Sequence, residues 1–286
     1  MAFGDRKDGK LLRDLDSLHF ITGILYPNRC DNEAFISERI DLTNLDRYLA
    51  EKNSTGPVYK YNLFQAIVTP LLRCITLREK MNRFIVNSNF YQRNVVSTAF
   101  VVKRIVKDER SPEMLAFLKA KDTDNFETVH NEIYRQVSKV RSGKSDTSTD
   151  SMNFFNKMPR GLSKTLVRFI MWLDKHGWVP DVLIGTDPYY SSCVVSNLGS
   201  LKMQSGYHHL TNWGTCSMIV LIGEMKKRPF YSEDGSVEMR NSVDVGITID
   251  ERIADGAYYA KTVKMLKKIL ENPELLEEDM NQPIEL

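Results

Sequence analysis

The sequence predicts a single α/β domain, because strand-like and helix-like segments alternate along one chain. Val243–Ile249 alternates apolar residues with small or polar ones, which is the period of a half-buried strand. Ala257–Leu270 then carries apolar residues at helical spacing, and Val95–Val106 is a long β-branched run suited to the centre of a sheet. The 286 residues, 42% of them hydrophobic, suffice for one large core. We therefore expect one domain over residues 1–286, with residues 1–30 as an N-terminal extension.

Composition excludes several classes of protein. Lys and Arg number 39 against 37 Asp and Glu, a net charge of +2, so neither nucleic acid nor an anionic membrane is expected as a partner. The first 20 residues are charged throughout, unlike a secretory signal, and Met218–Gly223 is far shorter than the roughly 20 apolar residues that span a bilayer. Cys30, Cys74, Cys193 and Cys216 lack metal-ligand spacing. We expect reduced thiols, no metal and a cytoplasmic location.

The first half of the chain offers four further elements. Ala34–Asp41 predicts a strand and Leu45–Lys52 a short helix. Tyr61–Arg78 predicts a longer amphipathic helix. Phe84–Gln92 predicts a hairpin, with its turn at Asn87–Asn89.

The middle of the chain is predicted to be helical. Ser111–Val140 is interpreted as two helices, the second capped by Asp124. Residues 141–152 are polar and Ser/Thr-rich, which indicates a mobile surface loop within the domain. Pro159–His176 predicts an apolar helix that ends at Gly177. Its buried side is expected to carry Phe169, Leu173 and Trp172.

The polar turn between the last strand and the last helix carries the most specific motif. Asp250–Ala257 reads DERIADGA. It resembles the D-H-R-x-x-D-G-A signature of the chloramphenicol acetyltransferase-like superfamily, most closely the catalytic acyltransferase domain of 2-oxo acid dehydrogenase complexes. In that family the histidine is the base that takes a thiol proton. Glu251 stands at the histidine's place in this chain. The matching residues are Asp250, Arg252, Asp255, Gly256 and Ala257.

A second stretch is similar to the same family. Ser191–Gly199, SSCVVSNLG, resembles the pattern G-T-F-T-[IL]-S-N-[LI]-G. Ser196 falls at the serine that donates a hydrogen bond to the oxyanion of the tetrahedral intermediate. Asn197 and Gly199 match positions that set the backbone path, and with Arg252 they are the candidate cofactor-binding residues. Weaker matches run from about Ala34 to Leu276, and Asp108–Pro188 matches poorly.

The resemblance implies a fold and an activity. The fold is a two-layer sandwich, with a mixed central sheet and helices packed on one face, that forms trimers. The activity is acyl transfer between coenzyme A and a second acceptor in a tunnel between subunits, where the base of one chain faces the serine of the next. Acyl-CoA is then a substrate, no metal is needed, and a homotrimer is expected. The acceptor is unknown, and no lipoyl or peripheral-binding domain is expected.

Replacement of the histidine leaves two interpretations of Glu251. An unperturbed Glu has a pKa near ~4.3, against ~6.5 for His, so proton transfer from a thiol becomes about 2 units, roughly 3 kcal/mol, less favourable. That corresponds to a rate on the order of a hundredfold lower. Burial raises a carboxyl pKa and would recover the loss, so Glu251 is either a base in a dry site or a solvated turn residue. Asp255 is expected to fix the loop by its charge rather than to act as a base.

Two adjacent histidines offer another base. His208 and His209 lie in Gly206–Thr215, after the oxyanion strand. Adjacent side chains on an extended chain point in opposite directions, so one of them is expected to face a given site. Either one replaces the missing base, or both are surface or subunit-contact residues. Two functions therefore stay open: an acyltransferase with an altered base, or a catalytically impaired relative acting as a trimeric CoA-binding or scaffold protein.

Overall fold

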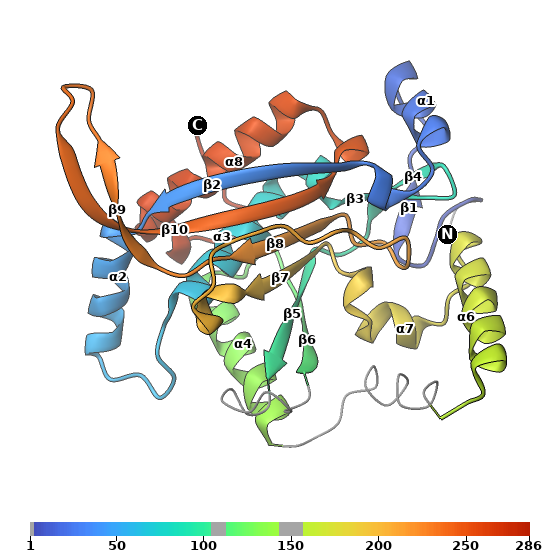
Figure 1. Cartoon of the computed structure of the whole chain (residues 1–286), viewed down its shortest axis with the longest axis horizontal. Coiled ribbons are helices and arrows are strands. Elements are labelled where there is room, and N and C mark those ends of the chain that lie inside the picture. The colour runs from blue at the N-terminus through green and yellow to red at the C-terminus, as the bar shows by residue number, and fades with distance from the viewer. Residues whose placement is uncertain (1–2, 104–112, 143–156) are drawn as a thin grey trace.

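A mixed seven-stranded sheet forms the centre of the molecule, as predicted (Figure 1). The computed structural model describes residues 3–103, 113–142 and 157–286. The strand order is β2-β10-β8-β7-β5-β6, and β9 pairs with β10 beyond the reach of β8. β7 runs parallel to β5 and β8, and the other pairs are antiparallel. The strands are β2 (Glu33–Asp41), β5 (Ser97–Lys103), β6 (Glu113–Lys119), β7 (Cys193–Asn197), β8 (Met218–Ile222), β9 (Lys226–Tyr231) and β10 (Val237–Asp250).

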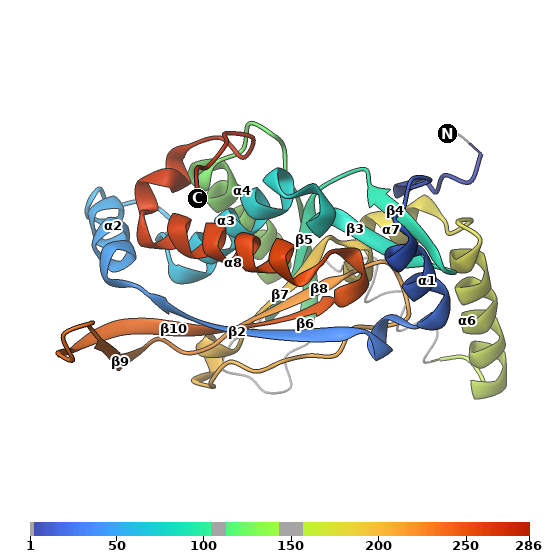
Figure 2. The same ribbon diagram turned by 90° about the horizontal axis from the view of Figure 1, so that it is seen from above.

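Helices cover one face of this sheet, which confirms the predicted two-layer sandwich (Figure 2). The covering helices are α2 (Thr43–Ser54), α3 (Leu63–Leu77), α4 (Phe126–Arg141) and α8 (Gly256–Glu271). On β10, Val243, Val245, Ile247 and Ile249 all belong to the core between the layers. Asn62 and Gln65 form a capping box that starts α3. No helix in the described part of the chain combines the length and apolarity needed to cross a bilayer.

A small sheet and three more helices stand at one end of the molecule. The helices are α1 (Ser17–Leu25), α6 (Arg160–Lys175) and α7 (Asp181–Thr186), and the strands are β1 (Gly9–Leu11), β3 (Arg83–Val86) and β4 (Asn89–Arg93). Asn87 and Ser88 have positive φ angles of 50° and 61°, as a two-residue hairpin turn requires, so the predicted hairpin is confirmed. Arg6 forms a buried ion pair with Asp174, at 2.9 Å. This ion pair fastens the segment around Arg6 to α6.

The prediction that Ser111–Val140 begins with a helix is wrong. Glu113–Lys119 forms β6, which pairs with β5 along its whole length. Residues rich in Met, Leu, Ala and Lys favour a helix locally, but pairing with β5 decides the outcome. The second helix, α4, is confirmed, although its cap is Asn125 and not Asp124. Ser111 and the loop residues 143–152 lie outside the described residues.

The prediction of which side of α6 is buried is also wrong. The helix forms over Arg160–Lys175, but Phe169 is 52% exposed and Trp172 is 47% exposed, while Leu173 is half-buried. Apolar periodicity indicates which side of a helix is hydrophobic, but it does not say whether this chain covers that side. Within the described residues, α6 therefore has an apolar face that no other segment covers.

Candidate functional site

The motif turn at the end of β10 is held by a buried ion pair. Nη2 and Nε of Arg252 lie 2.7 and 2.8 Å from the carboxylate oxygens of Asp250, and Asp250 is fully buried. Arg252 also donates through Nη1 to the carbonyl oxygen of Tyr26, at 2.6 Å. The guanidinium of Arg252, which was predicted to contact a cofactor, is thus used to hold the turn together.

Asp255 caps the last helix. Its carboxylate accepts a hydrogen bond of 2.8 Å from the backbone N–H of Tyr258, and Lys80 lies 3.9 Å away. The Tyr258 N–H, followed by the charge of Lys80, lowers the pKa of the Asp255 carboxyl. An ionised capping residue holds the loop, as expected. Arg252, the nearest arginine in the sequence, pairs with Asp250 and not with Asp255.

Glu251 is exposed at the start of the turn. Its backbone N–H donates to the carbonyl oxygen of Asn32, at 2.9 Å, and its carbonyl oxygen accepts from the hydroxyl of Tyr259, at 3.1 Å. Among the described residues no cation lies within ion-pair distance of the Glu251 carboxylate. The backbone is therefore fixed, while a single chain provides no dry pocket for the side chain.

Ser196 lies on the sheet face opposite the helices. Along β7, Cys193 and Val195 belong to the main core, whereas Val194 packs with Ile219 on the other face. Strand alternation places Ser196 on the same face as Val194. Its side chain is half-buried.

The residues after Ser196 determine how the strand ends. The Asn197 carboxamide accepts from the backbone N–H of Ser200, at 3.2 Å. A Cβ on Gly199 would lie 2.5 Å from the carbonyl oxygen of Gly223, so only glycine permits this close approach of the two backbones. These contacts agree with the expected backbone roles; contact with a cofactor stays a prediction.

The sheet register places Ser196 and Glu251 far apart along the sheet. Ser196 pairs with Leu221, and Leu221 pairs with Gly246. Glu251 lies five residues beyond Gly246, which is about 17 Å along the strand direction at ~3.3 Å per residue. It is also two strand spacings, about 10 Å, to the side. One chain therefore does not bring these two side chains together.

The loop that carries the two histidines runs along the same face of the sheet towards the motif turn. It begins beside Gly246, where a Cβ would collide with the carbonyl oxygen of Gly206. The ring of Tyr207 lies 5.1 Å from that of Phe35. The backbone N–H of Leu210 then donates to the carboxylate of Glu33, which pairs in the sheet with Asp250. His208 and His209, between these anchors, thus lie level with the end of β10.

Arg29 fastens the second half of the loop to the same turn. The guanidinium is buried, donates to the carbonyl oxygens of Thr211 at 2.6 Å and Gly214 at 3.1 Å, and lies 3.9 Å from Asp250. Its backbone N–H donates to the side chain of Asn212, at 2.8 Å. Sequence reasoning missed Arg29, because an arginine in a polar turn gives no signal of partners about 180 residues away.

The hydrogen bonds of His208 determine which ring nitrogen can act as a base. Nδ1 lies 2.8 Å from the carbonyl oxygen of His209. A carbonyl oxygen only accepts, so Nδ1 carries the proton and the neutral ring presents the lone pair of Nε2. The two rings stack with centroids 4.6 Å apart, so the expectation that the adjacent side chains point in opposite directions is wrong, because this segment is not a strand. Both rings are exposed in the single chain.

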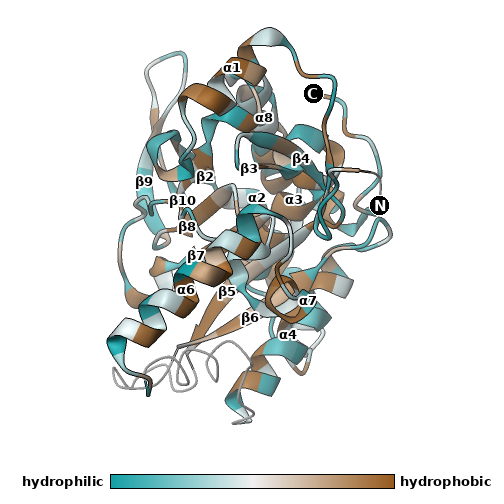
Figure 3. Cartoon of the chain, turned by 90° about the vertical axis from the view of Figure 1, so that its right-hand side faces the viewer, coloured by the Kyte–Doolittle hydropathy of each residue, from teal (hydrophilic) through white to brown (hydrophobic). Residues whose placement is uncertain are grey.

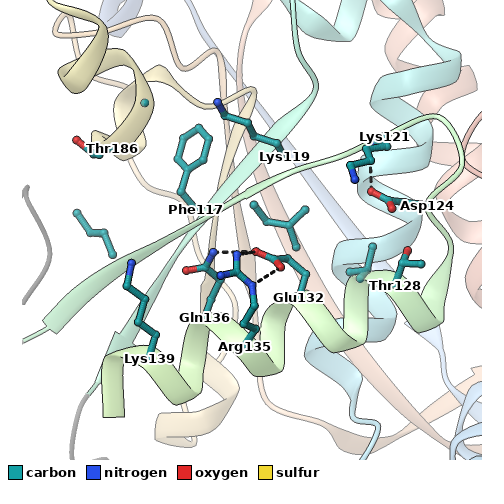
Figure 4. A pocket seen from close by; sticks show the side chains of 14 residues that line it. Phe117, Lys119, Lys121, Asp124, Thr128, Glu132, Arg135, Gln136, Lys139 and Thr186 are labelled. Atoms are coloured by element: carbon teal, nitrogen blue, oxygen red, sulfur yellow. Dashed lines mark hydrogen bonds and ion pairs between the residues drawn. The ribbon is translucent and has the colours of Figure 1, made fainter. Parts of the chain in front are cut away.

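Two cavities lie apart from Ser196. One of about 250 Å³ is bordered by Arg29, Asn212 and Gly214, and so adjoins the anchor of the histidine loop. The larger, about 680 Å³, lies between β6 and α4 and is lined by charged side chains (Figure 4). Glu132 is held there by Arg135 at 2.5 Å and Gln136 at 2.8 Å. Among the described residues no group of three or more His, Cys, Asp or Glu side chains has the geometry of a metal site.

Comparison with known proteins places the fold. Residues 187–277 match the model of the 2-oxoacid dehydrogenases acyltransferase family (catalytic domain). A probable dihydrolipoamide acetyltransferase from Listeria monocytogenes 4b F2365 superposes with a TM-score of 0.61 at 14% identity, over 92% of this chain and 95% of that one. A chloramphenicol acetyltransferase superposes with a TM-score of 0.59 at 11% identity, over 92% and 99% of the two chains. No curated protein matches the sequence.

A third structure bears on the motif. The dihydrolipoamide acetyltransferase of Azotobacter vinelandii was studied for the roles of a serine, a histidine and an asparagine in its catalytic mechanism. It superposes with a TM-score of 0.62 at 12% identity, over 93% of each chain. The chain therefore has the chloramphenicol acetyltransferase-like fold of the 2-oxoacid dehydrogenase acyltransferase catalytic domains, and its segment 187–277 is similar to that family in sequence.

Proposed function

We propose that this protein transfers an acyl group from acyl-CoA to a second acceptor, at a site that two copies of the chain build together. The observation that carries the proposal is the separation of Ser196 from the motif turn along the sheet. Both segments keep their place in the family pattern, yet one chain holds them far apart along the sheet. A homotrimer in which the serine end of one copy meets the turn of the next would complete the site.

The proposed roles follow from the chemistry of each side chain. For a thiol acceptor, Nε2 of His208 takes the thiol proton as sulfur attacks the acyl carbonyl and the C–S bond forms. The Ser196 hydroxyl donates to the resulting oxyanion. As that oxyanion collapses, the bond to the sulfur of CoA breaks and His208 returns the proton to the departing thiolate. The transfer needs no oxidant or metal.

His208 is preferred to Glu251 as the base for two reasons. The unperturbed pKa of imidazole is about 2 units closer to that of a thiol than the pKa of a carboxyl is. The hydrogen bond from Nδ1 to the carbonyl of His209 leaves Nε2 as the free acceptor, in a loop that is anchored level with the turn where the family has its histidine. The loop thus offers an imidazole to a site where Glu251 stands in place of the family's histidine.

Acyl transfer from acetyl-CoA to a panel of thiols and amines tests the proposal. We expect Ser196→Ala to lose about 10²–10³-fold in rate, as removal of an oxyanion donor does. We expect His208→Gln to lose about 10²–10⁴-fold, as removal of a general base does. His209→Gln and Glu251→Gln serve as matched controls and should retain most of the rate. Equal rates for wild type and Ser196→Ala would contradict the proposed function.

The replacement of the family's histidine by Glu251 favours one alternative, a catalytically impaired relative that binds CoA or acts as a scaffold. Its test is Glu251→His. A wild type without transfer, together with a gain of thiol-dependent transfer in Glu251→His, would support this alternative.

A further inference from the structure

Helix α6 exposes a continuous apolar strip. At 100° per residue, Leu162, Phe169 and Trp172 fall within about 80° of one another around the helix. These side chains are 55%, 52% and 47% exposed. Figure 3 shows α6 crossing the near side of the molecule with alternating hydrophobic and hydrophilic bands. Surface helices normally bury such a strip, so this one is available to a partner.

The strip continues into an aromatic cluster. The ring centroids of Phe169 and Trp172 lie 6.0 Å apart, and those of Trp172 and Trp178 lie 5.5 Å apart. The ring of His176 contacts both tryptophans, with its centroid 4.4 Å from that of Trp172 and 5.3 Å from that of Trp178. Trp178 is itself 60% exposed. Tryptophan is enriched at membrane–water interfaces because its ring is amphipathic.

The strip is flanked on one side by basic residues. Arg160, Lys164, Arg168 and Lys175 fall within about 80° around the helix. The single acid of α6, Asp174, is buried and paired with Arg6.

Charge is therefore concentrated in this segment. Residues 157–179 carry five Lys or Arg and one Asp, a net charge of +4, whereas the whole chain carries +2. The rest of the chain is thus slightly acidic. The whole-chain value, which argued against an anionic membrane, conceals this local excess.

We propose that α6 and the aromatic cluster after it form a docking surface for an anionic lipid bilayer. A helix that lies in the interface plane needs an apolar strip for the acyl boundary and a Lys/Arg-rich flank for the anionic headgroups, and α6 provides both. Charge complementarity selects this partner over a symmetric contact with a second copy, because the same face of that copy would bring the same positive charges together.

Vesicle binding by the full chain tests the proposal. The probes are vesicles of phosphatidylcholine alone and of phosphatidylcholine mixed with phosphatidylglycerol. We expect sedimentation with the anionic vesicles only, and release at about 1 M salt, where the Debye length shrinks to about 3 Å. Tryptophan emission should shift to the blue on binding, because Trp172 and Trp178 enter an apolar phase.

Two double variants distinguish the basic flank of α6 from the net charge of the whole chain. Lys164→Glu/Arg168→Glu removes the basic flank, and we expect at least a tenfold loss of vesicle binding. Lys261→Glu/Lys264→Glu makes the same total change in charge at exposed positions of α8 and should bind as the wild type does. Equal losses in both variants would show a non-specific charge effect and overturn the proposal.

The apolar strip has its own variant, Phe169→Ser/Trp172→Ser. We expect it to lose vesicle binding without a change in the mass of the assembly. If wild type binds neither vesicle and this variant instead dissociates the assembly in analytical ultracentrifugation, the strip is a contact between copies and the proposal falls. Equal binding to neutral and anionic vesicles would likewise overturn it.

Discussion

At the scale of residues, the motif turn depends on charges that are buried together. Asp250 is fully buried between Arg252 and Arg29, and both guanidinium groups also donate to backbone carbonyls. Burial lowers the pKa of Arg29, and the Asp250 carboxylate opposes that shift. The carboxylate is thus what makes two buried cations tolerable.

Asp250→Asn is therefore expected to destabilise the fold strongly. It leaves two buried cations uncompensated, which costs about 3–5 kcal/mol in the free energy of unfolding. Urea denaturation followed by circular dichroism measures the loss. Glu238→Gln is the control, because Glu238 pairs with Arg240 at the surface and such a pair contributes about 0–1 kcal/mol. A loss below about 1 kcal/mol in Asp250→Asn would contradict the role given to the pair.

His130 gives a pH-dependent prediction. It is buried in α4, 3.1 Å from the side chain of Gln65 and stacked on Tyr61 with ring centroids 3.9 Å apart. Burial lowers the pKa of His130, so the unfolded chain binds the proton more readily than the folded one. The stabilisation is complete above the unfolded pKa, near ~6.5, and is lost as the pH falls below it.

The measurement compares wild type with His130→Gln between pH 7 and about 5.5, using thermal or urea unfolding. Wild type should lose stability over this window, and the variant should lose less because it lacks the titrating ring. Identical pH profiles would show that His130 binds a proton equally well in the folded and unfolded states, and would contradict the prediction.

At the scale of elements, sequence predicted those pieces whose periodicity is set by the main core. β10 and α8 lie where the alternating and helical patterns indicated, since both bury one side against the same layer. β6 was predicted as helix, because its composition favours helix and only the distant pairing with β5 makes it a strand. Ser196 and Glu251 were recognisable from motifs. The contacts of Arg29 were not, because they join segments far apart in the chain.

The histidine loop depends on a glycine in β10. Gly246→Ala would place a Cβ against the carbonyl oxygen of Gly206, so we expect the loop to lift from the sheet. Acyl transfer should fall more than stability, because His208 moves while the core stays packed. Hydrogen exchange over residues 203–210 should accelerate. Gly256→Ala is the matched control, because nothing lies within 4 Å of its added Cβ. Unchanged exchange in Gly246→Ala would contradict the anchoring.

At the scale of the whole molecule, the two halves of the proposed site are expected to come from different copies. Ser196→Ala and His208→Gln should each be inactive alone. If the two are unfolded and refolded together, random mixing leaves about a quarter of the sites with both intact side chains in a cyclic trimer. Transfer should therefore return to about a quarter of the wild-type rate. A mixture as inactive as its components would place both groups in one chain.

Arg29 and Glu33 hold the histidine loop through its backbone, so the residues that position the loop differ from the proposed base. Neither the arginine nor the glutamate would touch a reacting atom, yet together they decide where an imidazole can stand. In such a scaffold a catalytic side chain can move from one segment to a neighbouring one, because other residues fix the backbone that carries it. If His208 is the base, a residue absent from the family's signature performs its chemistry here.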